Sequence, residues 1–295
     1  MEEINYLQEV GIEELPESLF HYTSITAILG IIENAELWAS NSKFLNDVRE
    51  MQEAIEYFKS EVASYNCFTS AEDEGRLLRE ALIEVLDDEN LILNDVYVFS
   101  LSGCQDSLEQ WRAYTPDSKG VALEFSAEGL CKLRDTQKLR IVKCFYKEAE
   151  KANLVKDFVK MIELSLHEKG SYGLQCNKMS AGDKKDAYKT FLKQEIVHLK
   201  YFLAMIKHEC FENELEFRLV YIPNKDTEKL ETFFRESSFS LTPFVKIKID
   251  INKLFKSIYL GPNQNKLATD AFRLYVNEKD LNVEVFTSQL PFRSR

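Results

Sequence analysis

The chain has 295 residues, is 45 % hydrophobic and carries a formal net charge of −12 from 49 acidic and 37 basic residues. This composition supports one large core or two modest ones and excludes a disordered chain. The negative charge opposes diffuse binding to nucleic acids and anionic membranes, because charges of like sign repel at long range. A lysine-rich stretch at 178–200 is the one candidate for a local basic groove, and a solvated helix face explains it more simply.

Targeting signals and metal-binding cysteine patterns are missing from the sequence. No run approaches 18 apolar residues, and the opening Met-Glu-Glu-Ile-Asn has neither the basic nor the apolar region of a signal peptide. We therefore expect a cytoplasmic protein that does not engage a membrane. The six cysteines show no C-x-x-C pair and no regular spacing, so they indicate neither a disulfide framework nor a zinc site.

The first half of the chain reads as helices followed by strands. After a short stretch at 19–22, apolar spacing predicts a helix at 24–36 that Ser24 caps. A capping box of Asp47 and Glu50 begins a second helix, whose apolar stripe runs from Met51 to Val62. Next we expect a helix at 76–86, a strand at 95–102, a short helix capped by Asp106, and strands at 120–125 and 139–146.

The second half begins with a helical stretch and returns to strands. Helical periodicity dominates about 150–209, with a polar break at 170–182 and a long segment at 186–208. Strands follow at 214–222, 244–249, 256–260 and 282–287, with a helix at 265–276 before the last of them. Without repeats or linkers, we predict a single α+β domain over 1–295, with a helical insertion at about 150–209.

The pattern Glu-Leu-Glu-Phe-Arg within 211–221 is the best candidate for chemistry. If this segment is a strand, period-2 alternation places Glu214, Glu216 and Arg218 on one face and the apolar residues 215, 217, 219 and 221 on the other. Two carboxylates about 7 Å apart repel, so a cation, a buried donor or a ligand must compensate for them. The alternative is a solvated sheet face with one Glu–Arg pair.

Two further groups of side chains suit a ligand. His21, Tyr22 and Thr23 precede the first helix, where backbone N–H groups and the helix dipole favour an anion or a ribose. In the alternative interpretation, Ser24 only caps the helix, Tyr22 is a packing residue and His21 lies on the surface. A second group offers hydroxyls and ring faces on which a planar heterocycle could stack, although rings of this kind often belong to a core: Ser100, Ser102, Trp111 and Tyr114.

Several familiar chemistries lack their motifs. The chain contains no G-x-G-x-x-G, no G-x-x-x-x-G-K-[ST], no H-E-x-x-H and no G-x-S-x-G, and it has only four histidines. A metal enzyme or a triad enzyme is therefore not indicated. His208 and Cys210 lie two residues apart, which directs them to different faces of a helix and argues against a Cys–His dyad.

Taken in order, these motifs resemble a widespread bacterial family of uncharacterised proteins. The resemblance spans about 20–262 and rests on Phe20-His21-Tyr22-Thr23-Ser24, Leu37-Trp38-Ala39-Ser40, Leu45-Asn46-Asp47 with Glu50, Phe99-Ser100-Leu101-Ser102, Trp111 and Tyr114, 120–125, Phe211 with Glu214, Glu216 and Arg218, and Gly261-Pro262. That family is in turn distantly similar to the ADP-ribosyltransferase superfamily, which includes toxin and phage-defence members. The resemblance implies a split, mostly antiparallel sheet with flanking helices that holds NAD.

The resemblance also implies roles for individual residues. His21 would hold the adenosine-side ribose, Ser100 and Ser102 would line the second motif, and Glu216 would be catalytic, with Glu214 orienting or deprotonating the acceptor. Either Tyr22, Trp111 or Tyr114 would stack on nicotinamide. We expect NAD as substrate, no metal, a protein or nucleic acid as acceptor, and an antitoxin or inhibitor protein as a further partner.

Two other functions remain open at this point. One is a non-catalytic module of the same fold that binds a nucleotide or a protein. The other is a nucleic-acid enzyme such as a nuclease, for which Asp47, Glu50 and Glu216 would supply metal-binding carboxylates. The charge of −12 and the lack of a basic track speak against the nuclease.

Overall fold

A computed structural model describes residues 15–45, 49–64, 72–116, 119–168, 179–224, 229–236 and 241–291. Asn46 and Asp47, and with them the expected capping box, lie outside the described residues. The chain divides into two compact units. The helical unit comprises the described residues of Asn41–Val96 and Cys144–Phe211, and the sheet unit those of Glu13–Ser40, Tyr97–Lys143 and Glu212–Arg295.

The sheet unit is built on one mixed, mostly antiparallel sheet. In chain order, its strands among the described residues are β1 (Ser18–Thr23), β2 (Glu36–Asn41), β3 (Tyr97–Ser102), β4 (Val121–Ser126), β5 (Arg140–Lys143), β6 (Glu216–Tyr221), β7 (Thr232–Glu236), β8 (Leu241–Lys248), β9 (Phe255–Leu260) and β10 (Glu284–Thr287). The order in space is β10-β9-β4-β1-β3-β2-β8-β7, with β6 pairing β3 and β5. β10 pairs with β9 in parallel.

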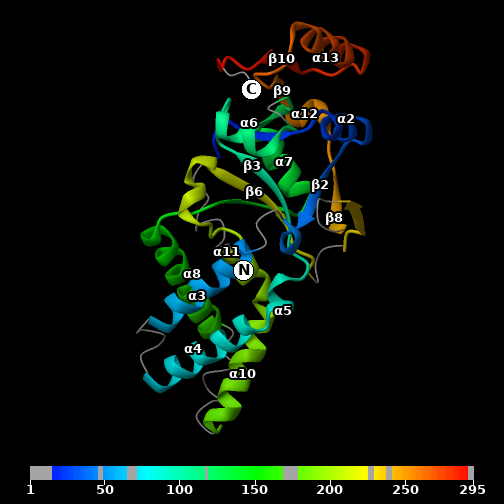
Figure 1. Cartoon of the computed structure of the whole chain (residues 1–295). Coiled ribbons are helices and arrows are strands. Elements are labelled where there is room, and N and C mark those ends of the chain that lie inside the picture. The colour runs from blue at the N-terminus through cyan, green and yellow to red at the C-terminus, as the bar shows by residue number, and fades with distance from the viewer. Residues whose placement is uncertain are drawn as a thin grey trace. The chain divides into compact units, whose positions relative to one another are not determined.

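β3 is the branch point of this sheet. β6 pairs with it antiparallel along its whole length, from Tyr97 opposite Tyr221 to Ser102 opposite Glu216 (Figure 1). A strand has two edges, so β1 and β2 must share the other one. β1 pairs with β3 only at the end of β3, where Phe20 lies opposite Ser102. An opening therefore lies along this edge of β3, next to Ser100, and the site described below is built there.

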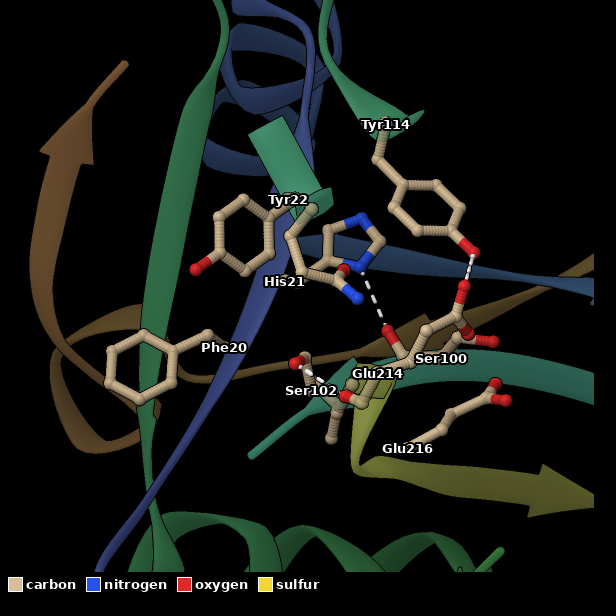
Figure 2. Close-up of a pocket in the computed structure, with 10 residues that line it drawn as sticks. Phe20, His21, Tyr22, Ser100, Ser102, Tyr114, Glu214 and Glu216 are labelled. Atoms are coloured by element: carbon tan, nitrogen blue, oxygen red, sulfur yellow. Dashed lines mark hydrogen bonds between the residues drawn. The ribbon is translucent and has the colours of Figure 1, made fainter. Parts of the chain in front are cut away.

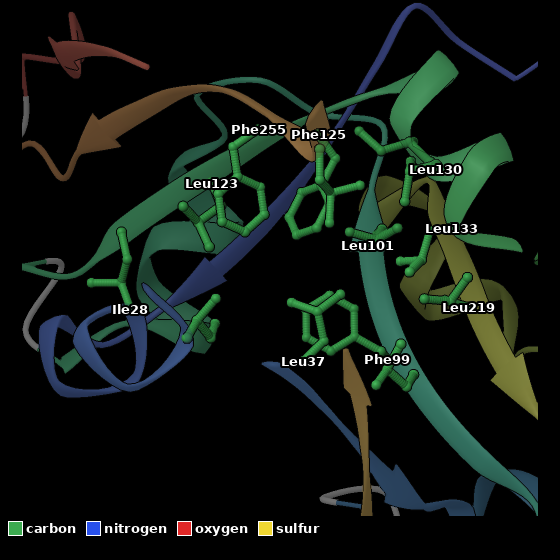
Figure 3. Packing of buried hydrophobic residues seen from close by; sticks show 14 of the residues in the cluster. Ile28, Leu37, Phe99, Leu101, Leu123, Phe125, Leu130, Leu133, Leu219 and Phe255 are labelled. Carbon is green, nitrogen blue, oxygen red and sulfur yellow. The ribbon is translucent and has the colours of Figure 1, made fainter. Parts of the chain in front are cut away.

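Short helices cover the sheet and close its core. α2 (Ile25–Asn34) begins at the expected cap, where Ser24 Oγ accepts a hydrogen bond from Ala27 N at 3.1 Å. The others are α6 (Leu108–Tyr114), α7 (Ala127–Gln137), α12 (Ile251–Leu254) and α13 (Lys266–Glu278). Figure 3 shows how residues of the strands and of α2 and α7 pack into one apolar cluster. Period-2 alternation assigns Leu19, Leu37, Phe99, Leu101 and Leu219 to this core face.

The helical unit is held by aromatic contacts between helices far apart in the sequence. Its helices are α3 (Glu50–Ser64), α4 (Glu72–Asp87), α5 (Glu89–Leu93), α8 (Glu148–Glu168), α10 (Ala181–Gln194) and α11 (Ile196–Leu203), with a 3₁₀ turn, η1, at Ser42–Phe44. Phe158 packs edge-on against Phe58 and Phe202, at centroid distances of 5.3 and 5.2 Å. All three rings are fully buried, and each such ring contributes a large share of a core's stability.

The structure corrects several expected boundaries. The segment 186–208 breaks at Glu195, where α10 ends and α11 begins. α7 and β7 were not predicted, and the stretch that contains Trp38 is the strand β2. α6 is capped by Ser107 rather than by Asp106, whose φ of 104° lies outside the usual range. The helices of 150–209 group with α3, α4 and α5, while the existence of a single domain stays a prediction. No helix among the described residues is long and apolar enough to cross a membrane.

Candidate functional site

A pocket of about 60 Å³ lies within the sheet unit at the branch of the sheet (Figure 2). It is lined by Phe20, His21 and Tyr22 of β1, Ser100, Leu101 and Ser102 of β3, Gln110 and Tyr114 of α6, and Glu214 and Glu216 beside and in β6. The sequence had singled out seven of these: His21, Tyr22, Ser100, Ser102, Tyr114, Glu214 and Glu216. The fold brings them together although they come from three separate parts of the chain.

Glu216 is a buried carboxylate held by a neighbouring guanidinium. Arg218 donates from Nε to Glu216 Oε1 at 3.0 Å and from Nη2 to Glu216 Oε2 at 2.9 Å. Glu216 is 5 % exposed and Arg218 2 %. The prediction that Glu216 and Arg218 point to the same face of the strand is therefore confirmed. The alternative, a Glu–Arg pair on a solvated sheet face, is wrong. Burying two charges is costly unless the geometry is good, and a bidentate pair supplies that geometry.

Glu214 lies beside the strand rather than on it, which corrects the expected strand at 211–221. Glu209–Glu214 form a 3₁₀ turn, η3, and Leu215 adopts a left-handed φ of 44° before β6 begins. The turn is tied to β3 because Gly103 N donates to Leu215 O at 2.9 Å. Leu215, which was expected on the core face, is half-exposed. The reversal still directs Glu214 into the pocket.

Two hydroxyl groups fix Glu214 in the pocket. Tyr114 Oη donates to Glu214 Oε1 at 2.7 Å, the contact drawn as a dashed line in Figure 2. Ser102 Oγ donates to the carbonyl of Glu214 at 2.7 Å and accepts from Cys104 N at 3.0 Å. The Ser102 hydroxyl therefore joins β3 to η3. Ser100, two residues earlier on the same strand face, is exposed.

His21 spans the opening between β1 and β3. Its Nδ1 lies 2.9 Å from the carbonyl oxygen of Ser100, and its ring stacks on Phe99 at a centroid distance of 4.2 Å. A carbonyl oxygen only accepts, so Nδ1 carries the proton. Burial, helped by the charge of Arg235, lowers the pKa of His21 from 6.5 to about 4, although the bond to Ser100 opposes this. The neutral ring therefore keeps Nε2 as a hydrogen-bond acceptor at pH 7.

Tyr22 and Trp111 support the pocket in a different way from that expected. Tyr22 Oη donates to the carbonyl of Cys104 at 2.7 Å and accepts from the backbone N–H groups of Asp106 and Ser107 at 3.0 and 3.1 Å. Burial raises the pKa of the Tyr22 hydroxyl. Trp111 is fully buried against Tyr22, and its Nε1 donates to Asp106 Oδ1 at 2.7 Å. Within the described residues, Trp111 and Thr23 are not part of the pocket wall, contrary to the expectation for them.

Three wall residues were not among the site residues expected from the sequence: Phe20, Leu101 and Gln110. Gln110 is the most informative because it is polar and only 4 % exposed. No side-chain partner for its amide occurs among the described residues, so the amide is available to a ligand. Its spacing of four from Tyr114 places both on one face of α6, and this spacing was a readable signal.

The wall presents acceptors and one amide to whatever enters. Its acceptors are the carboxylates of Glu214 and Glu216 and Nε2 of His21, and Gln110 adds both donors and an acceptor. Such a set suits hydroxyl groups and a centre that carries positive charge. Across the described part of the chain, no three His, Cys, Asp or Glu side chains gather in a way that could hold a metal ion.

Comparison with known proteins gives a family match without an activity. Residues 110–219 match a family model described as "Protein of unknown function (DUF2971)". The match begins at Gln110 and extends past Glu214 and Glu216, while β1 and β3 lie before it. No curated protein and no solved structure matches the chain. The expected resemblance to an uncharacterised family is thus supported, and the more distant resemblance to ADP-ribosyltransferases stays a prediction.

Proposed function

We propose that the protein is an NAD-dependent ADP-ribosyltransferase that modifies a protein or nucleic acid. One observation carries this proposal: His21, Ser100 and Glu216, which the resemblance names as the three parts of an NAD site, line one pocket. Their convergence depends on β3 pairing with both β1 and β6. The role as a toxin or phage-defence effector, with an antitoxin or inhibitor as partner, rests on the sequence resemblance.

The chemistry uses the acceptors of the wall. The N-glycosidic bond of NAD breaks, nicotinamide leaves with the bonding electron pair, and positive charge develops at C1′ of the ribose. The carboxylate of Glu216 stabilises this charge and binds the 2′-hydroxyl. A nucleophile of the acceptor forms the new bond to C1′, and its proton passes to Glu214. Nε2 of His21 accepts a hydrogen bond from a hydroxyl of the second ribose.

The size of the pocket limits what enters it. Pockets that hold whole cofactors measure roughly 300–1,000 Å³, whereas this one measures about 60 Å³. Only one moiety fits at a time, and the rest of NAD must lie along the opening of the sheet. Tyr114 is 41 % exposed and is tied into the pocket through Glu214. Rotation of this side chain away from Glu214 would widen the pocket.

The decisive experiment is an assay with labelled NAD and a cell extract, read as label transfer and nicotinamide release. We expect Glu216→Gln to lower both by about 10²-fold or more, since one preorganised charge is lost. The amide oxygen still accepts one hydrogen bond from Arg218, which limits the structural damage. Glu278→Gln, on the exposed face of α13, is the matched control and should behave like wild type.

Thermal melts of the same proteins separate catalysis from folding. The proposal fails if wild type neither transfers label nor releases nicotinamide. It also fails if Glu216→Gln, assayed well below its melting temperature, keeps the specific activity of wild type. In that case Glu216 serves only to neutralise Arg218.

A binding module without catalysis is the second candidate, and a specific observation favours it. Both carboxylates are already engaged, Glu216 by Arg218 and Glu214 by Tyr114. Such a module would hold a nucleotide without turnover. Calorimetric titration with NAD distinguishes the two functions, because a binder gives a stable heat of binding and releases no nicotinamide over hours.

A further inference from the structure

Arg235 lies on the part of the sheet that continues from the pocket beyond β2. It belongs to β7, opposite Thr242 of β8, and its Nη2 donates to Ser40 Oγ of β2 at 2.8 Å. Leu37 and Ala39 of β2 are in the core, so alternation directs Ser40 to the opposite face. The same argument directs Ser100 and Ser102 to that face, because Phe99 and Leu101 are in the core. The guanidinium of Arg235 therefore shares a sheet face with the serines of the pocket.

Arg235 carries a charge that the described residues leave unneutralised. Among them, no carboxylate forms an ion pair with it, and its one side-chain partner is the neutral hydroxyl of Ser40. Arg218 and Arg134, by contrast, are paired with Glu216 and Asp135. Partial burial also lowers the pKa of Arg235, with no compensating acid. Arg235 is also exposed to solvent, so the guanidinium donors that are not given to Ser40 are open to an anion.

The field of Arg235 reaches the pocket itself. Its charge is one of the causes that lower the pKa of His21, and Coulomb interactions of this kind fall off with distance and are screened by solvent. Arg235 is not part of the pocket wall, so it acts on His21 through its charge and not through a direct contact. A ligand that occupies the pocket and places an anionic group on Arg235 would therefore extend out of the pocket on the side of His21.

We propose that Arg235, positioned by Ser40, binds the phosphate groups of a nucleotide whose ribose occupies the pocket beside His21. The choice of a nucleotide diphosphate as ligand rests on the proposed function, whereas the anion site rests on the geometry of Arg235 alone. The planar guanidinium has further donors besides the one given to Ser40, and two of them in parallel suit a phosphate. Arg235 would thus hold the part of NAD that the pocket is too small to contain.

Calorimetric titrations with ADP-ribose, inorganic pyrophosphate and adenosine test this assignment. We expect Arg235→Gln to weaken ADP-ribose binding about tenfold or more and to remove pyrophosphate binding, because charge-assisted hydrogen bonds are lost. Binding of adenosine, which has no phosphate, should not change. Arg273→Gln, at an exposed arginine of α13, is the matched control and should bind like wild type. Arg235→Lys keeps the charge and should retain part of the pyrophosphate affinity.

A second readout needs no ligand. NMR titration of the His21 ring should give a higher pKa in Arg235→Gln than in wild type, since a nearby positive charge has been removed. The assignment is overturned if Arg235→Gln binds ADP-ribose as tightly as wild type, if wild type binds neither ADP-ribose nor pyrophosphate, or if the His21 pKa is unchanged.

The same titrations separate this inference from the proposed function. Binding of pyrophosphate and ADP-ribose that depends on Arg235, in a protein that does not cleave NAD, supports the anion site and refutes the transferase. Cleavage of NAD with equal affinity and rate in wild type and Arg235→Gln refutes the anion site and supports the transferase. Thermal melts confirm that each variant is folded, and Arg235→Lys repeats the comparison if Arg235→Gln is not.

Discussion

At the scale of single residues, His21 shows how position sets chemistry. A histidine on the surface of a protein titrates near pH 6.5 and alternates between donor and acceptor. His21 instead stacks on Phe99 and donates to the Ser100 carbonyl, which an adjacent strand would otherwise contact. The ring thereby fills the gap that β1 leaves along β3. The same contacts keep it neutral and fix its tautomer.

The depressed pKa of His21 makes a prediction for stability against pH. Between pH 6.5 and about 4 the unfolded chain binds a proton that the folded protein does not. The contribution of His21 is therefore fully present above pH 6.5 and is lost as the pH falls through this window, by at most about 3 kcal/mol. His21→Asn keeps a donor near the position of Nδ1 and cannot titrate. Urea unfolding at pH 7 and pH 4.5 should show a smaller loss for His21→Asn than for wild type, and equal losses would contradict the assignment.

Glu216 and Arg218 illustrate a second rule at this scale. Neither charge alone would be stable in a site this buried, since an unpaired buried ion costs several kcal/mol. Spaced two residues apart on one strand, they point the same way and neutralise each other. The pair keeps a charged carboxylate in the pocket wall. The charge of a glutamate exposed to solvent would instead be screened by water.

At the scale of elements, the loop between β3 and α6 positions half of the pocket. It has no regular structure of its own, and three of its backbone groups bind the hydroxyl of Tyr22. α6 begins directly after it, with Ser107 as its cap, and carries Gln110 and Tyr114. The orientation of α6 therefore depends on one side chain of β1.

We predict that Tyr22→Phe destabilises the protein by about 2 kcal/mol or more, because it leaves two N–H groups and one carbonyl without their partner. It should also weaken ADP-ribose binding, since α6 loses its anchor. Tyr275→Phe is the matched control: its buried hydroxyl has no hydrogen-bond partner among the described residues. Its removal should change the free energy of unfolding by less than about 0.5 kcal/mol. Chemical denaturation of the three proteins gives the comparison, and an equal effect of both substitutions would refute this role of Tyr22.

At the scale of the whole molecule, the two compact units contribute differently. Every residue of the pocket wall, as well as Ser40 and Arg235, belongs to the sheet unit. The helical unit has its own core, in which Phe58, Phe158 and Phe202 are in contact. The chain enters this unit twice, after β2 and after β5, and the helices of the expected insertion at about 150–209 belong to it.

This division predicts where a core mutation in the helical unit acts. Phe158→Ala should cost about 3–5 kcal/mol, as for other large buried aromatic residues, and increase hydrogen exchange at the amides of α3, α8 and α11. Amides of β1, β3 and β6 should keep their protection, and the affinity for ADP-ribose should not change, because no wall residue belongs to the helical unit. Equal loss of protection in both units would show one cooperative domain, as the sequence analysis expects.

Local features of the fold could be predicted from the sequence. The cap at Ser24, the stripe from Met51 to Val62 and the helix expected at 265–276 all appear in the structure. So does the strand character of β3, and most residues of the pocket wall were named in advance. Each of these signals lies within a few residues of the position it governs, where hydrogen bonds and apolar periodicity act directly.

Only the tertiary structure decided which of the named residues meet. Trp111 and Tyr114 are only three residues apart in α6, yet one is in the core and the other in the pocket, because β1 lies on one side of the helix. Arg235 reached Ser40 through the pairing of β7 with β8 and of β8 with β2. Glu214 left the strand because Leu215 reverses the chain against Gly103. Such placements depend on strand pairs that are distant in the sequence, and local preferences carry no information about them.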